Sequence, residues 1–77
     1  MRLTKAQVRF IGANLHAQDY WLARTGKILE CNPTCGREKI TMGALVRKGA
    51  IGQYGQFTKE ARRRFKAIVD RQARKNP

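Results

Sequence analysis

Residues 40–65 constrain the fold more than any other stretch, because two helical patterns there are separated by only a few glycine-rich residues. Gly49 stands where a helix would end in the left-handed conformation that glycine tolerates. Ile51 and Phe57 then flank a glycine-bracketed reversal at residues 52–55, a pattern typical of a short β-hairpin. The stretch therefore predicts a helix, a tight hairpin and a second helix in immediate succession.

The helix before the hairpin begins between residues 37 and 41 and places Ile40, Ala44 and Leu45 toward the core. That choice turns Met42 outward, together with neighbouring basic side chains. The helix after the hairpin runs from residue 59 to about residue 74, with Thr58 placed to cap its first turn. Its inward positions keep a helical period and are Ala61, Phe65, Ile68 and Val69.

The N-terminal segment predicts a helix over residues 5–17. Thr4 and Gln7 have the spacing of a capping box, in which each side chain satisfies a free backbone amide of the other residue. The predicted inward stripe consists of Val8, Ile11, Gly12 and Leu15. Side chains expected to face solvent are Lys5, Arg9, Asn14 and Gln18.

Residues 20–31 are open to two interpretations. Residues 20–23 and 27–31 are rich in aromatic and aliphatic side chains, and Gly26 stands between them, which favours a second β-hairpin. The alternative continues the first helix through Trp21 and ends it at Gly26. The hairpin is the preferred prediction, with Trp21 as a core or edge anchor.

Pro33 and Gly36 make residues 32–36 a loop, since neither a helix nor a central strand accommodates them at this spacing. The 77 residues suffice for one domain with one modest core, and residues 73–77 are expected to fray. The predicted fold class is α+β, a small single domain of the order helix, β-hairpin, helix, β-hairpin and helix.

The charge balance favours an acidic partner. Lysine and arginine number 17 against 5 acidic residues, a formal net charge of +12, and most of the excess follows Gly36. Such a charge opposes association with basic surfaces and attracts polyanions, nucleic acid first among them. The plainer interpretation is a solvated surface that only keeps the chain soluble.

No apolar run approaches the ~20 residues that span a bilayer, and the N-terminus lacks the pattern of a secretory signal. A cytoplasmic protein of a bacterium or a phage-infected cell is therefore expected. Cys31 and Cys35 are interpreted as free thiols, because His16 alone cannot complete a zinc site with them. With no paired catalytic groups and no phosphate-loop pattern, neither an enzyme nor a cofactor site is predicted.

The second half of the chain resembles winged-helix DNA-binding domains, in which a basic residue and glycine end the recognition helix and Thr-x-x-Ala-Arg opens the helix after the wing. About a third of the chain carries the resemblance. The matching residues are Ala44, Leu45, Arg47, Lys48, Gly49, Ile51, Phe57, Thr58, Ala61 and Arg62. The resemblance implies a reduced winged-helix fold and binding of duplex DNA by a transcriptional regulator or accessory factor.

Two sets of contacts are expected on DNA. The recognition helix would reach bases in the major groove through Lys39, Thr41, Met42 and Arg47. The wing and the start of the last helix would hold phosphates through Lys48, Gln53, Tyr54, Gln56, Lys59 and Arg62.

Two other functions fit the sequence. One is an interaction protein or inhibitor, encoded by a phage or mobile element, that docks on an acidic host protein through Tyr20, Trp21 and Met42. The other is an RNA or ribosome binder. The sequence leaves the oligomeric state open, and a dimer is compatible with it.

Overall fold

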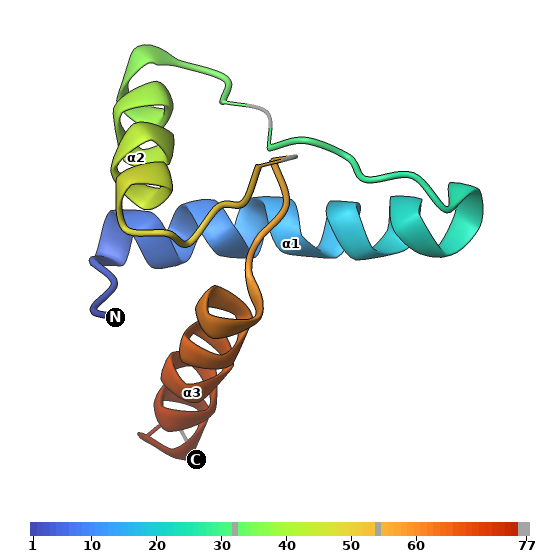
Figure 1. Cartoon of the computed structure of the whole chain (residues 1–77). Coiled ribbons are helices and arrows are strands. Elements are labelled where there is room, and N and C mark those ends of the chain that lie inside the picture. Colours follow the sequence, from blue (N-terminus) through green and yellow to red (C-terminus); the bar gives the residue numbers. More distant parts are fainter. Residues whose placement is uncertain (32, 54, 76–77) are drawn as a thin grey trace.

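The computed structural model describes residues 1–31, 33–53 and 55–75 (for Lys75 the backbone only), and this part of the chain forms three helices (Figure 1). It contains no β-strand within those ranges. The predicted α+β class and its winged-helix architecture are therefore wrong, and the fold is all-α.

Helix α1 spans Lys5–Thr25 and begins at the predicted capping box. The Gln7 amide donates to Thr4 Oγ1 at 3.2 Å, and the Thr4 amide donates to Gln7 Oε1 at 2.9 Å. The helix ends at Gly26, whose φ of 71° is left-handed and whose amide donates to the Leu22 carbonyl at 2.8 Å. The capping box is confirmed, and the helix is longer than predicted.

The predicted hairpin over residues 20–31 is wrong, because α1 continues through its first half. Two side chains there bond to residues one turn earlier in the helix. Thr25 Oγ1 donates to the Trp21 carbonyl at 2.8 Å, and Arg24 Nη1 donates to the Tyr20 hydroxyl at 2.9 Å. A hairpin at this end of so small a molecule would have left two strand edges unpaired. The alternative interpretation, a helix that ends at Gly26, is confirmed.

Helix α2 spans Gly36–Arg47. The chain turns away from it at Gly49, the residue that was predicted to adopt the left-handed conformation at the end of the helix. Gly49 has φ 80°, its amide donates to the Val46 carbonyl at 3.1 Å, and the Ala50 amide donates to the Leu45 carbonyl at 2.9 Å. These two bonds satisfy the last carbonyls of the helix and turn the chain sharply.

The second predicted hairpin is reduced to a turn. Ile51 and Phe57 form one isolated antiparallel bridge, and the Gly52 amide donates to the Gln56 carbonyl at 2.7 Å. The pairing extends no further because the chain enters α3 directly after Thr58.

Helix α3 spans Lys59–Lys75. The predicted cap is confirmed, since the Ala61 amide donates to Thr58 Oγ1 at 3.3 Å. The helix includes residues 73–75, and residues 76 and 77 lie outside the described part of the chain.

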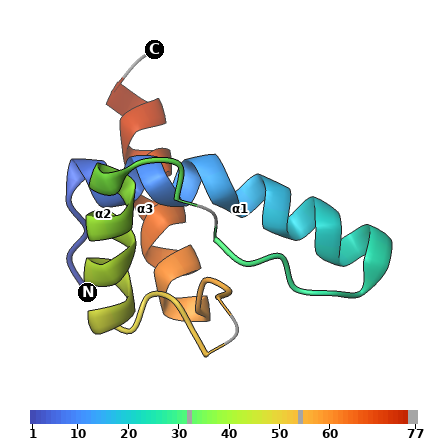
Figure 2. The ribbon, with the colours of Figure 1, turned by 90° about the horizontal axis from the view of Figure 1, so that it is seen from above.

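Both views show α2 and α3 against the N-terminal half of α1, while the C-terminal half of α1 extends beyond them (Figures 1 and 2). The core lies where the three helices and the turn meet. Its buried members are Phe10, Ile11, Cys31, Leu45, Ala50, Ile51, Phe57 and Ala61, with Leu3, Leu15, Met42 and Phe65 packed against them.

Four predicted side-chain directions are wrong, among them that of Val69, which was assigned to the inward stripe of α3 and is 40% exposed. Ile40 was assigned to the core and is 73% exposed, whereas Met42, assigned to the outer face, packs against the core. The two residues lie on different faces of α2, and the rotation that buries Leu45 together with Met42 also turns Ile40 to solvent. Gln18, expected to face solvent, is 4% exposed.

Candidate nucleic-acid interface

The chain before α1 is held in place by Lys48, at the end of α2. Lys48 Nζ donates to the Arg2 carbonyl at 2.7 Å and to Gln7 Oε1 at 2.8 Å. Gln7 Oε1 therefore serves both the capping box and the lysine. These contacts fix Arg2 and Leu3 beside the first turn of α1.

A groove runs between this N-terminal region and α3, and we call it the cationic groove. Its apolar lining consists of Leu3, Val8 and Ile68. Its polar lining consists of Arg2, Lys5, Arg9, Arg64, Arg71 and Gln72, with no acidic residue.

Helical spacing explains why these side chains meet. Lys5 and Arg9 are four residues apart on α1, so they share one face. On α3, Arg64, Ile68 and Arg71 follow one another at intervals of four and three residues and also share a face. Packing of α3 against α1 brings the two faces together across the apolar lining.

The charges of the cationic groove are not neutralised by neighbours. In the described part of the chain the ion pairs are Arg62 with Asp19, at 2.8 Å, and the Met1 ammonium with Glu60, at 3.9 Å. None of the five cations in the groove takes part in either pair. Five like charges lining one hollow attract an anion with several negative charges more strongly than they attract a single small ion.

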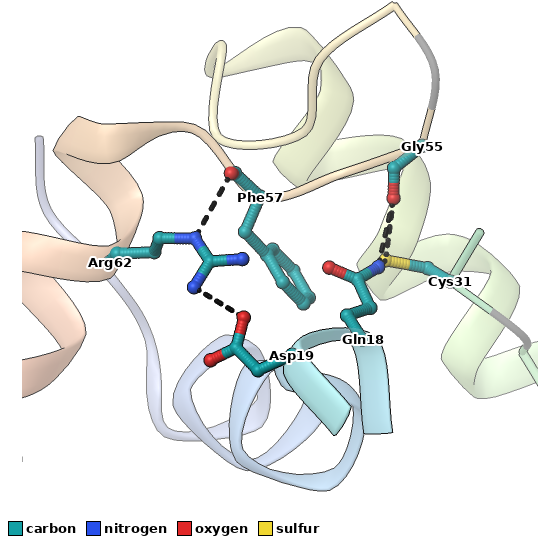
Figure 3. Close-up of polar contacts among 6 residues, drawn as sticks. All are labelled: Gln18, Asp19, Cys31, Gly55, Phe57 and Arg62. Carbon is teal, nitrogen blue, oxygen red and sulfur yellow. Dashed lines mark hydrogen bonds and ion pairs between the residues drawn. The ribbon is translucent and has the colours of Figure 1, made fainter. Parts of the chain in front are cut away.

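Two cations predicted to hold phosphate have partners within the protein. Lys48 holds Arg2 and Gln7, as described above. Arg62 Nη1 contacts Asp19 of α1, and Arg62 Nε donates to the Phe57 carbonyl at 3.4 Å (Figure 3). This arginine therefore joins α3 to α1 and to the end of the turn.

The predicted base-contacting residues do not share one face of α2. Thr41 lines a hollow between α1 and α2 and donates to the Arg37 carbonyl at 3.1 Å. Met42 packs against the core. Lys39 and Arg47 are exposed, and the guanidinium of Arg47 lies near Gly43, where an added Cβ would be 3.5 Å from it.

The predicted contacts from the turn and from the start of α3 are dispersed as well. Gln53 is exposed beside a hollow that also contains Met42, and the Gln56 side chain lies over Gly52. Lys59 is exposed at the first position of α3. Tyr54 lies outside the described residues.

The turn is attached to α1 by a small buried polar cluster (Figure 3). Gln18 Nε2 donates to the Gly55 carbonyl at 3.0 Å and to Cys31 Sγ at 3.2 Å, and Cys31 Sγ donates to the same carbonyl at 3.3 Å. Burial raises the pKa of the Cys31 thiol, while the hydrogen bond from Gln18 opposes that shift in part. The cluster is therefore built around a neutral thiol.

Cys31 is buried and Cys35 exposed, and both are free thiols. Among the residues that the structure describes, no three His, Cys, Asp or Glu side chains lie close enough together to hold a metal ion.

Comparison with protein-family models, curated proteins and solved structures found no match for this chain. No described helix combines the length and the apolar character that crossing a bilayer requires.

No sequence pattern predicted the cationic groove as one surface. The spacing of Lys5 and Arg9, and of Arg64 and Arg71, was a signal that each pair shares a helical face. Periodicity along one helix does not tell which faces of two helices meet, and that is a property of the packed molecule.

Proposed function

We propose that this protein binds nucleic acid through the cationic groove. Five exposed cations from two separate parts of the chain line one hollow that has no acidic side chain, and this observation carries the proposal. A row of closely spaced phosphates matches such a surface, because each contact releases counterions from the nucleic acid.

The side chains of the groove suit phosphates better than base edges. Arginine and lysine at the mouth of a groove position a protein on the backbone and carry little sequence information. We therefore expect binding to duplex DNA of many sequences, as in an accessory protein or a regulator with a weakly specific contact. Lys39, Arg47 and Lys59 are exposed outside the groove and would add to the attraction.

The cytoplasm is the proposed location. There the thiol form of Cys31, which donates to the Gly55 carbonyl, would be preserved by reducing conditions.

The test compares two double variants of α3 that remove the same charge. R64Q/R71Q removes two cations of the groove, and R63Q/K66Q removes two exposed cations that do not line it. Affinity for a random-sequence duplex would be measured by fluorescence anisotropy at several salt concentrations. Each lost phosphate contact makes the slope of log K against log salt shallower by about 0.9.

We expect R64Q/R71Q to lose affinity severalfold or more and its salt slope to become shallower by about 1.8. The control should stay close to the original protein. Equal losses in both variants would mean that net charge alone attracts DNA, and the groove would then not be the site. Competition with a structured RNA would rank the two nucleic acids.

A further inference from the structure

The cationic groove has an apolar floor as well as a basic rim. The floor consists of Leu3, Val8 and Ile68, which are half-buried, whereas the five cations of the groove and Gln72 are exposed. The apolar side chains therefore lie deeper than the charges around them. Phosphates match the rim but offer nothing to the floor, so contacts to phosphates alone leave the floor unused.

The floor and the rim belong to the same two helical stripes. On α1, Val8 stands between Lys5 and Arg9, and on α3, Ile68 stands between Arg64 and Arg71. Spacings of three and four residues place each apolar side chain on the face that carries its two basic neighbours. A ligand that covers the floor thus has positive charge on both sides of it.

The dimensions of the groove admit bases but not a duplex. The hollow has a volume of about 470 Å³, within the range of sites that take small molecules. Arg64 and Arg71 are seven residues apart. At about 1.5 Å per residue this is roughly 10 Å along α3, the rise of about three stacked nucleotides. The bases of an intact duplex are stacked behind its two backbones, so such a duplex reaches only the rim.

We propose that the floor of the cationic groove holds unpaired bases, so that DNA with a short single-stranded stretch is preferred over fully paired DNA. This preference depends on the proposed function and narrows its ligand. Unpaired bases present their apolar faces to Leu3, Val8 and Ile68, while the phosphates of the same strand meet the cations of the rim.

The contact with the bases should tolerate many sequences. Burial of aliphatic surface is non-directional, and every base has a flat face that can cover it. Gln72 is the lining side chain that can both donate and accept hydrogen bonds, and it would add a contact to a base edge or a sugar. The groove therefore distinguishes unpaired from paired DNA more strongly than it distinguishes one base from another.

A small amphiphilic anion fits the groove less well. An acyl chain would cover the floor, but its single carboxylate would leave most of the five cations without a partner. A nucleic-acid strand supplies one phosphate for each base, so it matches the floor and the rim together.

Three duplexes of otherwise identical sequence test the preference. The first is fully paired, and the second has a gap that leaves three nucleotides of one strand unpaired. In the third, the same three nucleotides are replaced by abasic sugar-phosphate units, which keep the phosphates and the flexibility of the gap and remove only the bases. Affinity for each would be measured by fluorescence anisotropy at one fixed salt concentration.

Two variants with matched chemistry test the floor. V8T/I68T exchanges two β-branched side chains of the floor for threonine, and V46T/V69T exchanges two exposed valines outside the groove. Neither variant changes the net charge, and circular dichroism would verify that both retain their helices. R64Q/R71Q, measured on the same duplexes, reports on the phosphate contacts themselves.

We expect the gapped duplex to bind at least about fivefold more tightly than both the paired and the abasic duplex. V8T/I68T should reduce this advantage to less than about twofold and leave the affinity for the paired duplex nearly unchanged, because all five cations remain. V46T/V69T should retain the advantage. R64Q/R71Q should weaken binding of all three duplexes.

Equal affinity for the gapped and abasic duplexes would overturn the proposal, because any gain would then come from the flexible backbone. An advantage of the gap that V8T/I68T leaves intact, or that both threonine variants reduce equally, would also overturn it, since the bases would then not lie on the floor. In each case a loss of affinity for the paired duplex in R64Q/R71Q would still support the phosphate site. No loss there would overturn the proposed function itself.

Discussion

At the level of single residues, Gly55 is constrained both by its backbone conformation and by a close neighbour. Its φ is 76°, and a Cβ added there would lie 3.0 Å from the Glu30 Cβ and 3.2 Å from the Glu30 Cα. Gly49 has a similar φ of 80°, with no atom within 4 Å of an added Cβ. Alanine substitutions at the two glycines therefore distinguish the free energy lost to an unfavourable backbone conformation from the free energy lost to a close contact.

We expect Gly49→Ala to lower the free energy of unfolding by about 1 kcal/mol, through the left-handed backbone alone. Gly55→Ala should lower it by about 2 kcal/mol or more, because the chain carrying Glu30 must also move. Urea denaturation followed by circular dichroism measures both. Equal losses in the two variants would show that the contact with Glu30 is easily relieved.

The Cys31 thiol makes stability depend on pH in the alkaline range. Its pKa is raised above the ordinary 9.0 by burial, so the thiol of the unfolded chain ionises first as the pH rises. The contribution of Cys31 is fully present below pH 9.0 and is lost as the pH climbs through the raised pKa.

We expect the free energy of unfolding to fall more steeply above about pH 9 in the original protein than in Cys31→Ala. All other ionisable groups are common to both proteins, so the difference between the two profiles isolates the thiol. Parallel profiles would mean that Cys31 ionises equally well in the folded chain.

At the level of elements, the start of α1 and the end of α2 are coupled through Gln7. Gln7 is 5% exposed and accepts hydrogen bonds from the Thr4 amide and from Lys48 Nζ. Loss of this side chain removes half of the capping box and also leaves Lys48 with only the Arg2 carbonyl.

We expect Thr4→Ala to cost about 1 kcal/mol, a fall in the thermal midpoint of about 4–8 °C. Gln7→Ala should cost more and should also weaken DNA binding, because Arg2 is then held less firmly. Thr25→Ala, at the exposed end of the same helix, should change the midpoint by much less. A loss for Gln7→Ala no larger than for Thr4→Ala would contradict the coupling.

Local signals predicted the helix ends well. The capping box at Thr4, the left-handed Gly49 and the cap at Thr58 were predicted from residue types alone, because each motif is satisfied by backbone groups within a few residues. The last helix was predicted from the helical period of its apolar residues, which is also a local signal, and it spans Lys59–Lys75.

Features that depend on distant partners were not predicted. Aromatic and aliphatic residues at 20–23 suggested a strand, but no other strand exists in the described chain to pair with it, and the helix prevails. The rotation of α2 was misjudged because Ile40 and Met42 are both apolar, and only contacts with the core decide which one is buried. The cationic groove likewise depends on how α3 crosses α1.

At the level of the whole molecule, the formal charge of +12 on 77 residues should make folding stability and the proposed binding of nucleic acid respond to salt in opposite directions. Repulsion among like charges opposes folding and is weakened by screening. Attraction to phosphates is weakened by the same ions.

We expect the thermal midpoint to rise by a few degrees when salt increases from about 50 mM to about 200 mM, while affinity for DNA falls steeply over the same range. Both are measured on one preparation, by circular dichroism and by anisotropy. A midpoint that falls with salt would instead show that ion pairs such as Arg62 with Asp19 outweigh the repulsion.

Every described residue from Tyr20 to Glu30 is exposed, so trypsin can reach the chain after Lys27 without entering the core. Such a cut leaves Phe10 and Ile11 on one fragment and Leu45, Phe57 and Ala61 on the other. Each fragment would keep half of one buried surface, and the pair should stay associated after cleavage. The long connection between α1 and α2 is thus the natural place to divide this protein into two pieces that reassemble.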